Sequence, residues 1–331
     1  MSEQKILNPY LIGEDERTIQ YRDGLAGRLE ILLEFTTKRE QEDITKGKLQ
    51  KFSASFNETQ YIQAACEIVI CSYFAENYTK DFKYEPKLNP PKNVECSFAY
   101  NDMRFNIEVK CADYSKNQDL SQNKGINLSF LGRHPDHKGV VDDISKLVQM
   151  LPNYEQLNVH QHMDNKMKDF LLSAHSKFNP NSSEKELNIL VVCCDTPLDV
   201  QQWHAYLYAE KGLFTKDSFY DKAEYRLVDV VLFTNLYHRH FRYREKDKIS
   251  NYWLLSDSFN LVFSNPFRCL DKKELIDLFL GMVPNYSQEL FNYQPSGEVD
   301  SFVKDSIRIS SFVHEKLISE GIFIFQPNLN Q

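Results

Sequence analysis

The sequence predicts an α/β protein in which a central mixed β-sheet is flanked by helices, with helical additions at both ends of the chain. Apolar strand-like runs at 187–194 and 227–233 enclose a helical stretch at 200–210. This β-α-β order favours a sheet that is extended by crossover connections. Upstream, a strong helical pattern precedes two strands of alternating polarity, and these three elements are expected at 58–77, 93–99 and 104–111.

The chain divides into three segments on the basis of these patterns. Residues 1–52 are charged and helical, and we assign them to an N-terminal helical extension. Residues 53–250 contain the sheet and its crossovers. Residues 251–331 combine aromatic strand-like pieces with helical patterns near 272–282 and 301–320, and we assign them to a C-terminal α+β extension.

Composition excludes several classes of protein. An apolar content of 42% with a charged content of 26% is ordinary for a globular domain. The longest apolar run, 187–194, is far shorter than the roughly 20 residues that a membrane-spanning helix needs. The seven cysteines include no CxxC pair and the N-terminus lacks the apolar core of a signal peptide, so we expect reduced thiols in the cytoplasm. The formal net charge of −8 gives no overall attraction to nucleic acid, so such binding must depend on local basic patches and metal ions.

The two alternating strands form a hairpin in one consistent register. Asn101 and Asp102 both tolerate positive φ and suit a two-residue turn between the strands. With this turn, one face is entirely apolar, with the pairs Phe98–Phe105, Cys96–Ile107 and Val94–Val109. Because side chains alternate along a strand, the other face pairs Ser97–Asn106, Glu95–Glu108 and Asn93–Lys110. The agreement of all six pairs supports the register.

The polar face of this hairpin predicts a metal site. Two carboxylates that face each other destabilise a hairpin, so either one is protonated or a cation lies between them. Hard oxygen ligands with room for water favour Mg²⁺, or Mn²⁺ as a substitute, over zinc. Lys110 projects from the same face as Glu108 and places an ammonium group beside the metal. A metal that polarises a phosphate and a lysine near the attacking water are what phosphodiester hydrolysis needs.

Glu95 followed by Ile107-Glu108-Val109-Lys110 resembles the signature of the PD-(D/E)XK nuclease superfamily. In that superfamily a helix with an internal acidic residue precedes the hairpin, and the run Tyr61–Ile70, which contains Glu67, matches this description. The resemblance covers about residues 55–195. It implies a restriction-endonuclease-like core within the α/β fold.

The resemblance also implies roles for individual residues. Glu95, Glu108 and the carbonyl of Val109 would hold the metal, and Lys110 would position or deprotonate the attacking water. Glu67 would bind a metal-bound water or a second ion. The alternative for Glu67, an acid on a mostly apolar helix face, is a buried ion pair.

This chain departs from the superfamily in one respect, because the usual aspartate of the first strand is absent. Either Glu95 replaces it with a longer side chain, or Asn93 occupies its position and Glu95 is a neighbouring acid. The bare acid-x-Lys tripeptide also occurs at six other places in the chain. Only Glu108–Lys110 lies on an alternating strand with an acid across a turn, and the alternative for it is a solvated sheet face of mixed charge.

Three stretches are candidates for contacts with nucleic acid. The run 237–244 interleaves aromatic residues with cations, which is typical of nucleic-acid surfaces and also of a solvated edge strand; its arginines are Arg239, Arg242 and Arg244. The polar segment 114–139, which includes Lys124 and Arg133, is a second candidate clamp. The predicted helix 140–151 carries Gln149 as a candidate phosphate contact, although an ordinary solvated face is favoured there.

Zinc and thiol chemistry are disfavoured by the sequence. The closely spaced histidine pairs have no CxxC partners, and Cys193 and Cys194 lie within an apolar strand. Burial in such a strand keeps a thiol inert as a nucleophile. No phosphate-binding loop of the GxxxxGK[ST] type occurs.

The sequence therefore predicts a Mg²⁺-dependent deoxyribonuclease, with RNA as an alternative substrate. Cutting both strands of a duplex with one site per chain favours a homodimer or a complex with a partner protein. No association with a membrane is expected. A role in restriction or anti-phage defence follows only from the common use of such folds. The competing hypothesis is a non-catalytic nucleic-acid-binding or assembly module with a degraded site, favoured by the missing aspartate and the acidic net charge.

Overall fold

The protein is an α/β structure with an open mixed sheet of six strands flanked by helices, as a computed structural model shows. The structure describes residues 6–53, 55–112, 126–129, 142, 146, 157–160, 163–208, 211–246, 248–249, 251–294, 308–309 and 311–319. The predicted α/β class with a central mixed sheet is confirmed. None of the helices in these ranges is long and apolar enough to cross a lipid bilayer.

The six-stranded sheet combines antiparallel and parallel pairs. Its strands are β3 (Lys83–Tyr84), β4 (Cys96–Tyr100), β5 (Met103–Cys111), β8 (Glu186–Cys193), β9 (Val230–Thr234) and β10 (Asn260–Ser264). They lie in the order β10-β9-β8-β5-β4-β3, in which β5, β8 and β9 are parallel neighbours and the remaining pairs are antiparallel. Two small sheets pair β1 (Ile6–Leu7) with β2 (Phe52–Ser53), and β6 (Ile126–Ser129) with β7 (Leu157–His160).

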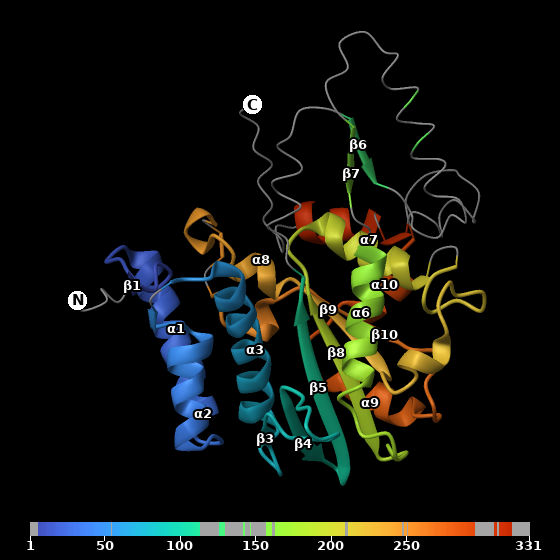
Figure 1. Cartoon of the computed structure of the whole chain (residues 1–331), viewed down its shortest axis with the longest axis horizontal. Helices are drawn as coiled ribbons and strands as arrows, with labels where there is room; N and C mark the ends of the chain where they lie inside the picture. The colour runs from blue at the N-terminus through green and yellow to red at the C-terminus, as the bar shows by residue number, and fades with distance from the viewer. Residues whose placement is uncertain are drawn as a thin grey trace.

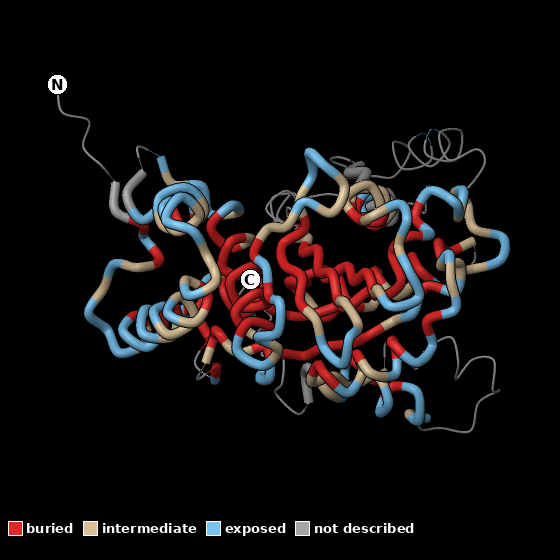
Figure 2. The backbone as a smooth tube through the Cα atoms, turned by 90° about the horizontal axis from the view of Figure 1, so that it is seen from below, coloured by how far each residue is buried: buried red, intermediate tan, exposed pale blue. Residues whose placement is uncertain are grey.

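The helices surround this sheet (Figure 1). The α-helices are α1 (Glu16–Leu33), α2 (Lys38–Glu42), α3 (Glu58–Asn77), α6 (Met163–His175), α7 (Pro197–Tyr208), α8 (Leu236–His240), α9 (Lys273–Met282) and α10 (Ser287–Asn292). The π-helical and 3-10 turns are η1 (Asp43–Lys48), η2 (Lys222–Tyr225), η3 (Tyr243–Glu245), η4 (Leu255–Asp257) and η5 (His314–Ser319). Buried residues concentrate in the middle of the molecule, and the outer helices are exposed along their outer sides (Figure 2).

The hairpin of β4 and β5 has the predicted turn. Asn101 and Asp102 adopt φ values of 49° and 59°, which is the left-handed conformation that a two-residue hairpin turn requires. Cys96 lies opposite Ile107, Ser97 opposite Asn106 and Phe98 opposite Phe105, as the sequence predicts.

The hairpin ladder ends earlier than predicted. The amide of Glu95 donates to the carbonyl of Ile107 at 2.9 Å, although Cys96 is already the residue opposite Ile107. Two residues opposite one make a β-bulge, which ends regular pairing. The predicted pairs Val94–Val109, Glu95–Glu108 and Asn93–Lys110 are therefore not part of the ladder.

Aromatic packing on the apolar face of the hairpin holds helices against the sheet. Phe98 and Phe105 stack at 5.2 Å between ring centroids. Phe74 of α3 lies 4.8 Å from Phe98, and Phe279 of α9 lies 6.3 Å from Phe105. Helices α3 and α9 thus cover one face of the sheet. Helices α6 and α7 pack against each other beside the sheet (Figure 1).

The predicted terminal extensions pack closely with the central segment. Helix α1 lies along α3, and its Tyr21 stacks on Tyr243 at 3.9 Å and approaches Trp253 at 5.0 Å. Strand β10, from the segment predicted as a C-terminal extension, forms the edge of the central sheet. Of the predicted helix 301–320, residues 308–309 and 311–319 are described, and they are helical. The segment 114–151 lies mostly outside the described residues.

A glycine on α1 allows its close contact with Trp253. A Cβ atom added at Gly24 would lie 2.5 Å from Trp253 Cδ1, whereas one added at Gly27, one turn later, would meet nothing within 4 Å. We expect Gly24→Ala to lower the free energy of unfolding by about 1–3 kcal/mol through overpacking. Gly27→Ala should instead raise it by about 0.5–1 kcal/mol through helix propensity. Urea denaturation of both variants measures the difference, and equal effects would contradict this account of the α1 contact.

Candidate active site

Four glutamates and three lysines meet at the end of the hairpin ladder, beside α3. We refer to the glutamates as the acidic cluster: Glu67 of α3, Glu85 after β3, Glu95 before β4 and Glu108 of β5. The lysines are Lys48 at the end of η1, Lys110 of β5 and Lys177 just after α6. Because β4 ends its pairing at Cys96, the part of β5 with Glu108 and Lys110 is paired in the structure only with β8.

Glu108 is the most deeply buried charge of the cluster, with no exposed surface. Its Oε1 atom lies 2.7 Å from Lys110 Nζ and 2.6 Å from Lys177 Nζ, in contacts that are ion pairs without hydrogen-bond geometry. Its Oε2 atom is also buried, and no described group donates a hydrogen bond to it. Since a buried ion costs several kcal/mol, the carboxylate depends on these two ammonium groups.

One ammonium group contacts the other three carboxylates. Lys48 Nζ lies 2.8 Å from Glu67 Oε2, 2.6 Å from Glu85 Oε1 and 3.7 Å from Glu95 Oε2. A cation among carboxylates was predicted, but a lysine of the N-terminal segment supplies one here. Lys48 belongs to no motif and is remote from the hairpin along the chain, so no sequence pattern points to it.

Glu67 forms the buried ion pair that was the alternative to a metal-site role. Besides its contact with Lys48, its Oε1 accepts a hydrogen bond from Gln63 Nε2 at 2.9 Å, one helical turn away. Both oxygens therefore have a partner, which satisfies an acid on this helix face.

The environment raises the pKa of the Glu95 carboxyl to about 8. Burial is the main cause and the nearby charges of Glu67 and Glu108 add to it, against the opposing effect of Lys48 and Lys177. Glu95 therefore holds a proton at neutral pH. A protonated carboxyl is, besides a cation, one of the two ways in which the repulsion between the carboxylates was expected to be reduced.

Lys110 keeps its proton. Burial lowers the pKa of its ammonium group, but Glu108, followed by Glu95 and Glu67, outweighs burial and raises the pKa above its ordinary value. A lysine that stays charged can orient a water or stabilise negative charge, and it cannot remove a proton. Of the two roles that the superfamily resemblance implies for Lys110, this environment favours positioning.

The choice between Glu95 and Asn93 depends on where each side chain lies. Asn93 Nδ2 donates to Glu85 Oε2 at 3.1 Å and is half-buried, so it supports a different acid of the cluster. Glu95 is buried within the field of Glu67 and Glu108. Of the two, Glu95 is the one whose pKa the charge of Glu108 affects.

The run 237–244 is neither an edge strand nor a continuous basic surface, which corrects the prediction for Arg239. This run forms α8 and η3, and Arg239 is only 4% exposed. Its guanidinium donates to the carbonyl of Asp257 at 2.6 Å and to that of Asn251. A buried guanidinium needs these partners and has no surface left for nucleic acid.

The other arginines of this run are exposed. Arg244 donates to the carbonyls of Pro9 and Ile12, so its charge is engaged by the N-terminal segment. Arg242 lies over the ring of Phe241 at 5.1 Å. The remaining candidates for nucleic-acid contacts, Lys124, Arg133 and Gln149, lie outside the described residues.

The raised pKa of Glu95 makes stability depend on pH. Between pH 4.5 and about 8 the folded chain holds a proton that the unfolded chain has released, so stability falls as pH rises through this range. Glu95→Gln keeps the protonated shape at every pH. We expect the free energy of unfolding of the variant, relative to that of the wild type, to rise by about 1–3 kcal/mol from pH 5 to pH 8. Denaturant unfolding in EDTA measures this gain, and a difference that does not change with pH would refute the assignment.

Removal of Lys48 should expose the repulsion within the acidic cluster. We expect Lys48→Ala to lower the free energy of unfolding by about 2–4 kcal/mol, because buried carboxylates lose their partner. Millimolar Mn²⁺ should restore part of this loss if a divalent cation can take the place of the ammonium group.

Lys46→Ala is the matched control in the same turn. Lys46 pairs with Glu42 at 3.6 Å on the surface, where both side chains are 71% exposed, and its removal should change stability by about 0.5 kcal/mol or less. Thermal and denaturant unfolding of both variants, with and without Mn²⁺, provide the measurement. Equal losses would show that Lys48 has no special role.

The chain was also compared with known proteins. No protein-family model, curated protein or solved structure matches it. What this site does must therefore be inferred from its residues, their burial and their charges.

Proposed function

We propose that the protein is a Mg²⁺-dependent nuclease that hydrolyses phosphodiester bonds of DNA, with Glu95, Glu108 and Lys110 as the central residues. The observation that supports it best is the Oε2 atom of Glu108, a buried anionic oxygen with no described donor, beside two ammonium groups. Such an oxygen is an available ligand for a hard cation. The position of Glu67 on the helix before the hairpin agrees with the superfamily resemblance.

The residues fit a magnesium ion with few protein ligands. Among the described residues, the carboxylate oxygens of Glu67, Glu95 and Glu108 do not all lie within 4.8 Å of one another. Mg²⁺ usually takes one or two carboxylates and keeps several waters, so Glu108 and Glu95 suffice, with the carbonyl of Val109 as the resemblance implies. The bound ion would polarise the phosphate and make its coordinated water more acidic. Binding would also require Glu95 to release its proton.

The lysines would handle the charge of the substrate. Lys110 stays protonated at neutral pH, so it would orient the attacking water and stabilise the negative charge that develops on the phosphate. Lys177 contacts the same oxygen of Glu108 and would hold that carboxylate in place. No sequence pattern points to Lys177, because it follows α6 and is far from Glu108 along the chain.

The contacts of Lys48 favour a second candidate function. A lysine that bridges three carboxylates satisfies them without a metal, as expected for a non-catalytic module that keeps the fold with a degraded site. The two functions differ in metal binding. If the wild type binds Mn²⁺ and Glu108→Ala does not, the result supports the nuclease. If neither protein binds Mn²⁺, the result supports the non-catalytic module.

Several parts of the proposal follow from the chemistry alone. Double-strand cleavage with one site per chain would need a homodimer or a partner protein. RNA would be cut by the same groups if the groove admitted its 2′-hydroxyls. A role in restriction or anti-phage defence is an analogy with how such folds are used.

Plasmid cleavage tests the proposal. With Mg²⁺, we expect the wild type to nick or linearise supercoiled DNA, and Lys110→Ala to slow this by at least about 100-fold, because a group that stabilises developing charge is lost. Lys83→Ala is the control, since Lys83 lies on the edge strand β3 of the same sheet and pairs with Asp81 on the surface. Undiminished cleavage by Lys110→Ala would refute the mechanism, and equal losses in both variants would indicate damage to the fold.

A further inference from the structure

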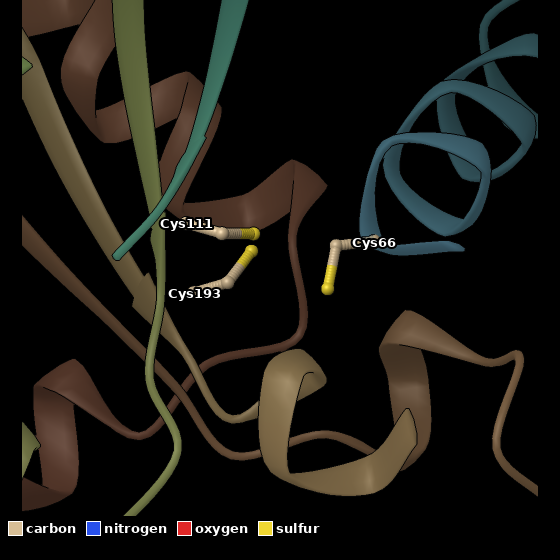
Figure 3. A group of neighbouring side chains, drawn as sticks. All are labelled: Cys66, Cys111 and Cys193. Atoms are coloured by element: carbon tan, nitrogen blue, oxygen red, sulfur yellow. The ribbon is translucent and has the colours of Figure 1, made fainter. Parts of the chain in front are cut away.

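Three cysteine thiols from three separate elements converge beside the acidic cluster. Cys66 belongs to α3, Cys111 ends β5 and Cys193 ends β8, and their sulfur atoms all lie within 4.8 Å of one another. Figure 3 shows the thiols of Cys111 and Cys193 directed toward each other and that of Cys66 facing them from the helix. Within the described part of the chain, this is the one group of three or more metal-binding side chains that is so compact.

We propose that Cys66, Cys111 and Cys193 form a three-thiolate site for a soft d¹⁰ cation, Zn²⁺ or Cu⁺. Around a tetrahedral ion with bonds of about 2.3 Å, neighbouring sulfurs lie about 3.8 Å apart. The three thiols are therefore within about 1 Å of the required spacing before any ion binds. Thiolate ligands select soft ions over the Mg²⁺ that suits the acidic cluster.

The fold explains why these three residues meet. Cys111 and Cys193 are directly paired in the parallel ladder of β5 and β8, at the ends of both strands. Because side chains alternate, Cys111 points to the sheet face that α3 covers, where Cys66 lies on the helix. An ion here would bind two neighbouring strands to the helix that covers them.

Cys111 is the member of the cluster nearest to solvent, because it is half-buried whereas Cys66 and Cys193 are fully buried. On binding, three thiols would release their protons to solvent and form three sulfur–metal bonds, with no oxidation. A fourth position on Zn²⁺ would remain for water, whereas Cu⁺ is stable with three sulfur ligands.

Apolar packing and a disulfide are the two alternatives to a metal at this cluster. Buried cysteines often serve as small apolar side chains, as Cys71 does on the same helix beside Cys96. Such packing would bind no metal. Directly paired cysteines on adjacent strands also suit a disulfide, which would consume the Cys111 and Cys193 ligands.

The experiment uses the full chain, purified with reductant and then freed of metal. Zn²⁺ and Cu⁺ are titrated separately against chelating indicators, and Co²⁺ is added as a spectroscopic probe. We expect about one equivalent per chain of at least one of the two ions. Co²⁺ should give the near-ultraviolet absorption of cobalt–thiolate bonds.

Variants locate the site. Cys66→Ser, Cys111→Ser and Cys193→Ser should each weaken the affinity by more than about 100-fold, since loss of a ligand exceeds the loss of an outer partner. Cys71→Ser is the matched control, a buried cysteine of the same helix outside the cluster, and should bind as the wild type does. Glu108→Ala should also leave this binding intact, which separates the thiol site from the proposed nuclease site.

A second measurement uses only the wild type, so its outcome does not depend on whether the variants fold. Alkylation of the wild type, followed by mass spectrometry, should show that the bound ion protects Cys66, Cys111 and Cys193 together. Failure to bind either ion, protection of other cysteines, or equal affinity in the three variants would overturn the proposal. A Cys111–Cys193 disulfide in protein purified without reductant, with no metal bound after reduction, would do so as well.

Discussion

The burial of the Glu108 carboxylate is the constraint on which the rest of the site depends. Strand β5 lies inside the sheet, between β4 and β8, and its parallel partner β8 is buried along nearly its whole length. A charge on such a strand cannot reach bulk water, and its desolvation costs several kcal/mol unless partners compensate. Lys110, from β5 itself, and Lys177, from the segment after α6, provide that compensation at one oxygen.

The same requirement makes the N-terminal segment part of the site. Glu67, Glu85 and Glu95 repel one another, and Lys48 reaches all three from the last turn before β2. With four carboxylates and three ammonium groups in the described cluster, one negative charge would remain. The raised pKa of Glu95 removes it, since that carboxyl holds its proton at neutral pH. The cluster is thus close to neutral without a metal, and a divalent ion must displace a proton or an ammonium group to enter.

How much could be predicted from the sequence depended on the range of the interactions. The helix at 58–77 and the first three hairpin pairs follow from local signals, namely apolar periodicity and two turn residues that accept positive φ. The bulge at Glu95 could not be foreseen, because the apolar residues Val94, Cys96 and Phe98 alternate through it without a break. Lys48 and Lys177 come from distant segments that no motif connects to the hairpin. Arg239 has the spacing of a strand surface, but its partners are carbonyls of the later segment 251–257.

The convergence of the cysteines also depends on contacts between distant segments, which the sequence does not reveal. It places two kinds of candidate ligand on the same elements. The pairing of Cys111 with Cys193 appears only once the parallel register of β5 and β8 is known. Lys110 and Cys111 are neighbours, yet alternation sends them to opposite faces of the sheet, and Cys66 and Glu67 diverge by the turn of the helix. Hard oxygen ligands therefore gather at the open end of the hairpin and soft sulfur ligands gather under α3. Since the two proposed sites would prefer different ions and share no residue, each would be occupied or lost independently of the other.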